Sequence, residues 1–180
     1  MSPDLHETLV RVAPFGVGLL LLGFLAAVRP KVRERLAWNP VPGRVLVRWL
    51  LLWVVWLLAT ELVTNALGRP APAPFAVRGA ALAIRILGIV VLAPLLEELA
   101  FRGVFFQLLR SRLGPGPTVG ATALLFTLAH AQYGLPELIQ VFLDGVLFGL
   151  ARLRTGSTRV PFCMHVLGNA LAAWQRLGLG

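Results

Sequence analysis

Residues 94–102 read Pro-Leu-Leu-Glu-Glu-Leu-Ala-Phe-Arg and lie inside an apolar run that extends from about residue 80 to residue 109. A carboxylate or guanidinium in the middle of a membrane helix costs roughly 2.5–3.5 kcal/mol even on mild insertion scales, so such groups usually face protein and have a function. Glu98 and Arg102 are four residues apart, so on a helix they share a face and can pair. Glu97 points about 100° away from Glu98, which leaves one carboxylate free for chemistry.

The composition around this stretch is that of an integral membrane protein. The 180 residues are 57% hydrophobic and 14% charged, with a mean hydropathy of +0.78. A soluble domain is typically about 45–50% apolar and about 25% charged. The apolar residues come in runs of roughly 18–23, which is the length that crosses a bilayer core. The sequence therefore predicts an all-α transmembrane helical bundle that contacts the lipid bilayer and has little mass outside it.

One transmembrane domain with about six spans is expected over residues 1–180. Residues 1–75 would hold two N-terminal anchor helices. Pro94 should kink the third span, because a proline inside a helix removes one backbone hydrogen bond. The expected spans cover about residues 8–28, 45–67, 76–112, 118–131, 137–153 and 159–174.

The net charge of +9 is concentrated in the predicted loops. Loops rich in arginine and lysine face the cytoplasm, so this pattern predicts that both termini lie outside it. The sequence contains no basic stripe interleaved with aromatic residues, and we expect no nucleic-acid partner. The basic residues in these loops or at the span ends beside them are Arg29, Lys31, Arg33, Arg35, Arg44 and Arg48, then Arg110 and Arg112, then Arg152, Arg154 and Arg159.

A few strongly polar residues lie deep in the last four predicted spans. Because lone polar groups are costly in a membrane, we expect them to converge on one water-filled cavity. At about 1.5 Å per residue, His130 lies farther along its helix than His165 does along its own. Convergence therefore requires the helix of His130 to begin below its neighbours or to tilt. The polar residues are Glu97, Glu98, Arg102, His130, Asp144, His165 and Asn169.

These residue types suit the hydrolysis of an amide bond. A free carboxylate beside a histidine can activate water. A second histidine with an asparagine amide, as at His165 and Asn169, can donate to a developing oxyanion. Two imidazoles and one or two carboxylates are also plausible zinc ligands, so the sequence leaves open whether the cofactor is a divalent metal or none at all.

Other intramembrane protease chemistries fit the sequence poorly. The serines are at positions 2, 111 and 157, near the N-terminus or in predicted loops, so a buried serine–histidine pair is not expected. The zinc-binding pattern H-E-x-x-H is absent from the sequence. The two aspartates, Asp4 and Asp144, cannot form an intramembrane pair. Cys163 lies in an apolar helix and is interpreted as a packing residue.

Three motifs follow in order along the chain: E-E-x-x-x-R from residue 97, F-x-x-x-H from residue 126 and H-x-x-x-N from residue 165. Together they resemble the CAAX protease and bacteriocin-processing family, also called the CPBP or Abi family, over about residues 82–174. The resemblance implies an intramembrane endopeptidase, metal-dependent or of glutamic type. It implies that Glu97 and His130 activate water, that Glu98 and Arg102 support them, and that His165 and Asn169 stabilise the oxyanion. If a metal takes part, its ligands would be Glu97, His130 and His165.

The resemblance also implies a membrane-anchored protein or peptide as substrate and the inner membrane of a prokaryote as location. Relatives divide among prenyl-protein processing, bacteriocin leader processing or immunity, and removal of C-terminal membrane anchors. Two alternatives stay open. Intramembrane Glu, Arg and His also mark ion paths, as in a small transporter or proton-coupled carrier, although such carriers often contain a repeat that we do not see here. The other alternative is a non-catalytic immunity or scaffold protein. Asp144 has no assigned role.

Overall fold

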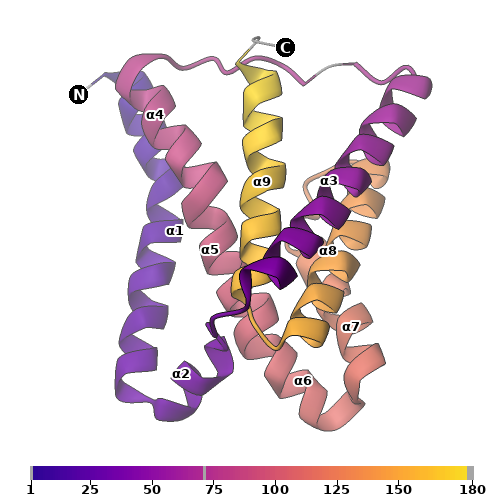
Figure 1. Cartoon of the computed structure of the whole chain (residues 1–180). Helices are drawn as coiled ribbons and strands as arrows, with labels where there is room; N and C mark the ends of the chain where they lie inside the picture. Colours follow the sequence, from indigo (N-terminus) through magenta and orange to yellow (C-terminus); the bar gives the residue numbers. More distant parts are fainter. Residues whose placement is uncertain (1, 71, 178–180) are drawn as a thin grey trace.

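The computed structural model describes residues 2–70 and 72–177, and its regular elements are helices throughout that part of the chain. The predicted all-α fold is confirmed (Figure 1). The helices are α1 (Pro3–Val28), α2 (Pro30–Leu36), α3 (Gly43–Ala66), α4 (Gly79–Leu87), α5 (Ala93–Glu98), α6 (Phe106–Leu113), α7 (Pro115–Leu128), α8 (Leu135–Thr155) and α9 (Arg159–Arg176), and the π-helical turns are η1 (Gly88–Leu92) and η2 (Leu99–Phe105).

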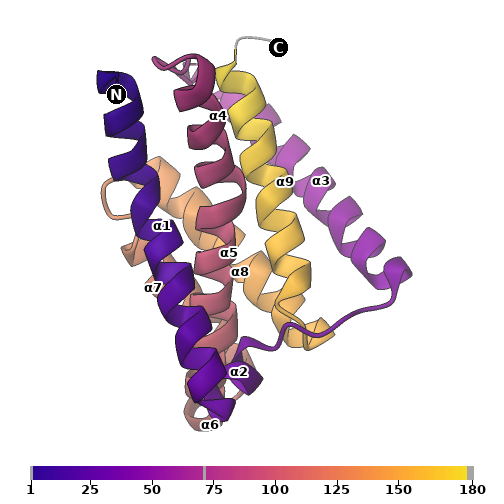
Figure 2. The ribbon, with the colours of Figure 1, turned by 90° about the vertical axis from the view of Figure 1, so that its left-hand side faces the viewer.

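The chain passes up and down between two ends of the molecule (Figures 1 and 2). Both chain ends and the segment between α3 and α4 lie at one end, which we call the terminal end. The opposite end carries α2, the α6–α7 turn and the α8–α9 turn, and we call it the basic end because the basic residues of segments 29–36, 110–117 and 152–159 lie there. The segments from α4 to α6 form one continuous helix, and α9 runs through the middle of the bundle.

Three helices are long and apolar enough to cross a membrane: α1, α3 and the continuous helix Gly79–Leu113. They expose large apolar side chains, such as Leu20 at 76% and Leu62 at 70%, as expected of surfaces that face lipid. The chain is therefore an integral membrane protein. Helix α7 has 14 residues, which is too short to meet the same criterion, so the count of six spans stays a prediction.

The polar residues reach one level because α7 begins lower than α9. The α6–α7 turn lies farther toward the basic end than the α8–α9 turn does (Figures 1 and 2). Helix α7 therefore rises past the start of α9, and His130, just beyond the end of α7, lines the same cavity as His165, with the ring of Phe126 beside both. Convergence of the polar residues required the helix of His130 either to begin below its neighbours or to tilt, and the structure shows the first arrangement.

The disturbance expected at Pro94 takes the form of a π-helical turn. At the end of η1 the Ala93 N–H donates to the Gly88 carbonyl, five residues back. The next bond of this ladder would run from residue 94 to the Ile89 carbonyl, but proline has no N–H. Asn169 of α9 fills the gap, since its Nδ2 donates to that carbonyl at 2.7 Å. Such π turns are frequent at functional sites.

The basic end contains a helix where the sequence analysis placed only a loop. Helix α2 spans Pro30–Leu36, with proline at its start. The chain just after it is bound to the α8–α9 turn: Thr158 Oγ1 donates to the Leu36 carbonyl at 2.6 Å and Thr158 N to the Ala37 carbonyl at 2.9 Å. Ser157 Oγ donates to the Asn39 carbonyl at 2.5 Å. These hydrogen bonds close the basic end.

Candidate active site

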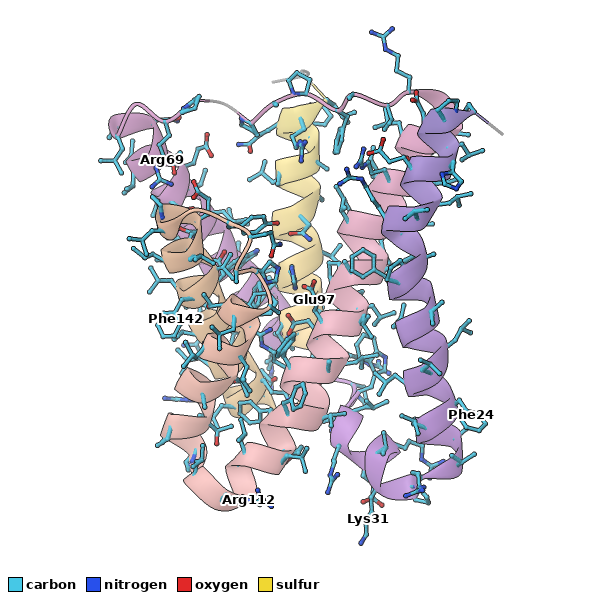
Figure 3. All side chains as sticks on the ribbon, turned by 180° about the vertical axis from the view of Figure 1, so that it is seen from behind. Phe24, Lys31, Arg69, Glu97, Arg112 and Phe142 are labelled. Atoms are coloured by element: carbon cyan, nitrogen blue, oxygen red, sulfur yellow. The ribbon has the colours of Figure 1, made fainter. Side chains whose placement is uncertain are left out.

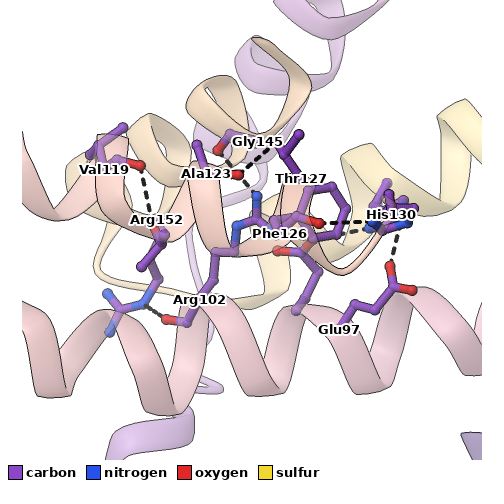
Figure 4. A network of polar contacts seen from close by, with 12 residues as sticks. Glu97, Arg102, Val119, Ala123, Phe126, Thr127, His130, Gly145 and Arg152 are labelled. Carbon is purple, nitrogen blue, oxygen red and sulfur yellow. Dashed lines mark hydrogen bonds and ion pairs between the residues drawn. The ribbon is translucent and has the colours of Figure 1, made fainter. Parts of the chain in front are cut away.

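A buried carboxylate lies at the centre of the bundle and joins two helices. Glu98 Oε1 accepts from Arg102 Nη1 at 3.1 Å and from His165 Nδ1 at 3.0 Å. Figure 4 shows the polar contacts on the other side of Arg102, toward Gly145 and Arg152. The side chains of Glu98 and Arg102 are 0% exposed. The pairing expected from the spacing of Glu98 and Arg102 is therefore present, and His165 is its third member.

Arg102 connects this pair to a third helix. Its Nη2 donates to the Gly145 carbonyl of α8 at 3.1 Å, and its guanidinium lies over the rings of Phe126 and Phe148, at 4.4 and 5.2 Å from their centroids. A buried ion pair is tolerated only where such additional partners offset the desolvation of both charges. The arginine therefore fixes η2 against α7 and α8.

Glu97 has a different environment from its neighbour. Its side chain is 21% exposed and lines a cavity, and its Oε2 is 3.7 Å from Nε2 of His165. It forms no hydrogen bond of ordinary length to another described side chain. Figure 3 shows Glu97 inside the bundle, between Arg69 at the terminal end and Arg112 at the basic end.

Both histidines have one ring nitrogen occupied by an acceptor. His130 lies in the turn after α7, and its Nδ1 is 2.8 Å from the Phe126 carbonyl, which can only accept. The Nδ1 of His130 therefore carries the proton, and in the neutral ring Nε2 keeps its lone pair. Nδ1 of His165 donates to Glu98 in the same way. In both rings it is Nε2 that remains for a reacting group.

Asn169 and Asp144 also line the cavity. One amide hydrogen of Asn169 is used by the Ile89 carbonyl, and an amide has a second one to donate. Asp144 Oδ1 accepts from Trp56 Nε1 at 2.7 Å and from Gln140 Nε2 at 2.8 Å, and these bonds fix its carboxylate on the cavity wall.

The cavity has a volume of about 1190 Å³. Its walls are mainly apolar and come from α3, α8 and α9, with Trp53, Leu57 and Ile139 among them, while Glu97 and His165 lie at its inner part. A cavity that is mostly apolar with a few convergent polar groups is the usual form of a binding site.

The side chains at this site are of the types that bind zinc, and their second hydrogen bonds also resemble those of zinc ligands. A histidine that binds metal typically donates its other ring N–H to a carboxylate or carbonyl, as His165 and His130 do. Within residues 2–70 and 72–177, however, no three histidine, cysteine, aspartate or glutamate side chains lie close enough together to share one ion. The arrangement does not fit a metal ion, and we derive no step through one.

All the polar residues singled out in the sequence meet at this cavity or directly beneath it. Glu97, His130, Asp144, His165 and Asn169 line it. Sequence analysis placed Arg152 at the cytoplasmic end of its span, beside the turn at residues 155–158, but the residue is 2% exposed and its Nε donates to the Arg102 carbonyl at 2.9 Å. No sequence signal distinguishes Arg152 from the arginines around it, because its burial depends on the packing of α8 against η2.

Comparisons with known proteins support the same interpretation. An uncharacterized 24.3 kDa protein of Escherichia coli is 35% identical over 170 residues, which covers 87% of this chain and 77% of that protein. No solved structure matches the chain.

Residues 79–171 match the family described as Type II CAAX prenyl endopeptidase Rce1-like. The match covers more than half of the chain, and it includes the three motifs, the continuous helix from α4 to α6 and most of α9. The resemblance seen in the sequence is therefore confirmed, and the chain belongs to the type II CAAX prenyl endopeptidase Rce1-like family, a family of intramembrane proteases.

Proposed function

We propose that this protein is an endopeptidase that hydrolyses a peptide bond in a membrane-tethered protein segment, with Glu97 as the general base. The observation that carries the proposal is the division between two neighbouring carboxylates. Glu98 is fully buried and hydrogen-bonded to Arg102 and His165, whereas Glu97 has only the longer contact of 3.7 Å to His165 and faces the cavity. The first supports the site and the second remains free to take a proton.

In the proposed reaction a water molecule lies between Glu97 and the Nε2 of His130. Glu97 accepts a proton from this water while the water oxygen attacks the carbonyl carbon of the peptide bond. His130 holds the water through Nε2, because its Nδ1 is bound to the Phe126 carbonyl. When the carbon–nitrogen bond breaks, Glu97 returns the proton to the leaving nitrogen, and the carboxylate is restored.

The negative oxygen of the tetrahedral intermediate needs hydrogen-bond donors. We assign this role to His165 and Asn169, which line the same cavity four residues apart on α9. A His165 ring protonated on both nitrogens is stabilised by Glu98 at Nδ1 and donates from Nε2. The second amide hydrogen of Asn169 is a further donor. Donors aimed at developing charge often provide the largest part of catalysis.

The direct test is the variant Glu97→Gln, which keeps the shape of the side chain and removes the base. The purified protein in detergent is given a panel of quenched fluorogenic peptides, each with an apolar C-terminal anchor. We expect cleavage to fall by about 10²–10⁴-fold, which is the usual contribution of a general base. The control is Glu34→Gln in the exposed helix α2, which should cleave normally.

The same assay is repeated after metal removal with a chelator and after addition of zinc. Cleavage that survives metal removal supports a water activated by Glu97. Cleavage that is lost and returns with zinc would instead make Glu97, His130 and His165 metal ligands. Normal cleavage by Glu97→Gln would contradict the assigned base. No cleavage of any peptide by the unmodified protein would favour a carrier or a non-catalytic family member.

A further inference from the structure

The two ends of the molecule differ in charge. Glu34 is the one acidic residue at the basic end of the described chain, beside a large group of arginines. The terminal end carries the acidic residues Asp4, Glu7, Glu61 and Glu137 together with fewer arginines. The basic residues of the basic end are Arg29, Lys31, Arg33, Arg35, Arg110, Arg112, Arg152, Arg154 and Arg159.

The cavity extends from the catalytic residues toward the terminal end. On α3 its lining begins at Trp53 and continues to Leu67, which follows the end of that helix. On α9 the lining begins at His165 and continues to Gln175, near the end of that helix. Helix α8 runs in the opposite direction and lines the cavity from its first residue as far as Phe148.

The rim of the cavity at the terminal end is polar and exposed. Gln175 Nε2 of α9 donates to Glu61 Oε2 of α3 at 3.1 Å. Arg69, just beyond α3, lies 3.5 Å from Glu137 at the start of α8. Water can reach such groups, so this rim is the mouth through which the cavity meets solvent.

The opposite side of the cavity is closed by packing. A cluster of buried residues lies between the catalytic groups and the basic end, and the hydrogen bonds from Ser157 and Thr158 to residues 36–39 cover it. Among the described residues, none of the loop residues of the basic end lines the cavity. The members of the cluster are Trp53, Phe148, Ala151, Val160 and Met164.

We propose that the catalytic cavity opens to the non-cytoplasmic side of the membrane and that its substrate is a membrane-anchored segment of an exported protein. Basic ends of membrane proteins face the cytoplasm, and the mouth lies at the other end. The cleavage part rests on the proposed peptidase function, whereas the orientation rests on charge and packing alone. Polar residues of both signs at the mouth suit the hydrated flank of an anchor, and the apolar walls suit the anchor.

Orientation is tested by cysteine labelling in sealed membrane vesicles. In a background in which the native thiol is removed by Cys163→Ala, Leu135→Cys places a thiol at the mouth and Arg112→Cys places one at the basic end. Both positions are exposed. A membrane-impermeant maleimide should modify Leu135→Cys in right-side-out vesicles and Arg112→Cys in inverted ones. Each should resist labelling in the other preparation until detergent opens the vesicles.

The side of the membrane from which substrate enters is tested with right-side-out and inverted vesicles that contain the native protein. A quenched peptide with an apolar C-terminal anchor of about 20 residues, long enough to span the bilayer core, is added from outside. We expect cleavage in right-side-out vesicles, cleavage in inverted vesicles only after detergent, and none with Glu97→Gln in either.

The outcomes separate the two proposals. The opposite labelling pattern, or cleavage in intact inverted vesicles alone, would overturn the orientation while the peptidase function stands. The expected labelling without cleavage, even in detergent, would contradict the peptidase function and leave the orientation supported.

Discussion

At Glu98, one buried carboxylate oxygen accepts from two side chains, an arginine four residues away and a histidine on another helix. The other oxygen, Oε2, is buried without a hydrogen-bond partner among the described residues. The negative charge of Glu98 is therefore compensated on one side only, by Arg102 and by any positive charge on His165. The charge of Arg102 is therefore the main compensation for this buried carboxylate.

Replacement of Arg102 should lower the free energy of unfolding more than replacement of a catalytic residue such as Glu97 does. In Arg102→Gln the buried Glu98 loses its cation, and breaking a buried pair on one side costs about 3–5 kcal/mol. We expect a lower melting temperature in detergent, measured by tryptophan fluorescence. Arg112→Gln, on the exposed surface of α6, is the control and should melt as the unmodified protein does.

The double variant Glu98→Gln/Arg102→Gln distinguishes charge from packing. It removes both charges, so it should recover part of the stability that Arg102→Gln loses. Equal melting temperatures for Arg102→Gln and Arg112→Gln would show that the pair contributes nothing to the fold.

Among the elements, the π-helical turn η1 is coupled to α9 through Pro94 and Asn169. Asn169→Ala leaves the part-buried Ile89 carbonyl without its donor, and the cost of about 1–3 kcal/mol for a fully buried unpaired carbonyl is the upper bound for this loss. Pro94→Ala supplies an N–H that can donate to this carbonyl instead. We therefore expect Asn169→Ala to lower the melting temperature in the native background and to have little effect on stability when combined with Pro94→Ala.

A double-mutant cycle of melting temperatures measures this coupling. Cleavage by the combined variant is the second measurement, and it should stay low if Asn169 also donates to the oxyanion. Additive losses of stability in the cycle would contradict the proposed substitution of one donor for the other. Pro115→Ala, at the first turn of α7, is a control because a proline there replaces no helical hydrogen bond.

Close packing of α7 on α8 places the Gly145 carbonyl beside Arg102. A methyl group at position 145 would lie 3.1 Å from the Ala123 Cα and 3.4 Å from Arg102 Nη2. We expect Gly145→Ala to cost about 1–3 kcal/mol, as overpacking does, and to reduce cleavage because it moves the arginine. Gly120→Ala is the matched control on α7, since nothing lies within 4 Å of the added methyl group. Equal melting and cleavage for both would contradict this.

Sequence periodicity and hydropathy predict the long helices, because membrane spans need continuous apolar residues. Expected and observed bounds agree closely for α3, expected at 45–67 and found at Gly43–Ala66. Helix α2 was missed because its charged residues resemble a cytoplasmic loop. The three motifs indicated which polar residues meet. The hydrogen bond from Asn169 to Ile89 could not be predicted, since it depends on how α9 rotates against a π turn.

At the scale of the whole molecule, one end is closed and the other is open. Thr158 is 0% exposed and its hydroxyl donates to the Leu36 carbonyl. Thr158→Val keeps the shape but leaves that carbonyl without the hydroxyl, at a cost of about 1–3 kcal/mol. We expect a lower melting temperature and faster maleimide modification of the native Cys163, which lies on α9 near this closure.

Ser111→Ala is the control for this prediction. Ser111 is also at the basic end, but its hydroxyl bonds only within its own exposed helix. It should leave both the melting temperature and the modification rate unchanged. Unchanged modification of Cys163 in Thr158→Val would show that residues 36–39 do not cover the basic end.

Hydrolysis consumes water, and the bilayer around this protein contains almost none. A volume of about 1190 Å³, at roughly 30 Å³ for each molecule of the liquid, corresponds to on the order of 40 water molecules. The cavity, which meets solvent at its mouth, thus has room for a reservoir of the second reagent. A peptide that occupies the cavity must expel most of this reservoir while one molecule stays at Glu97. The fit of the peptide therefore decides both how dry the reaction centre becomes and whether any water is left to react.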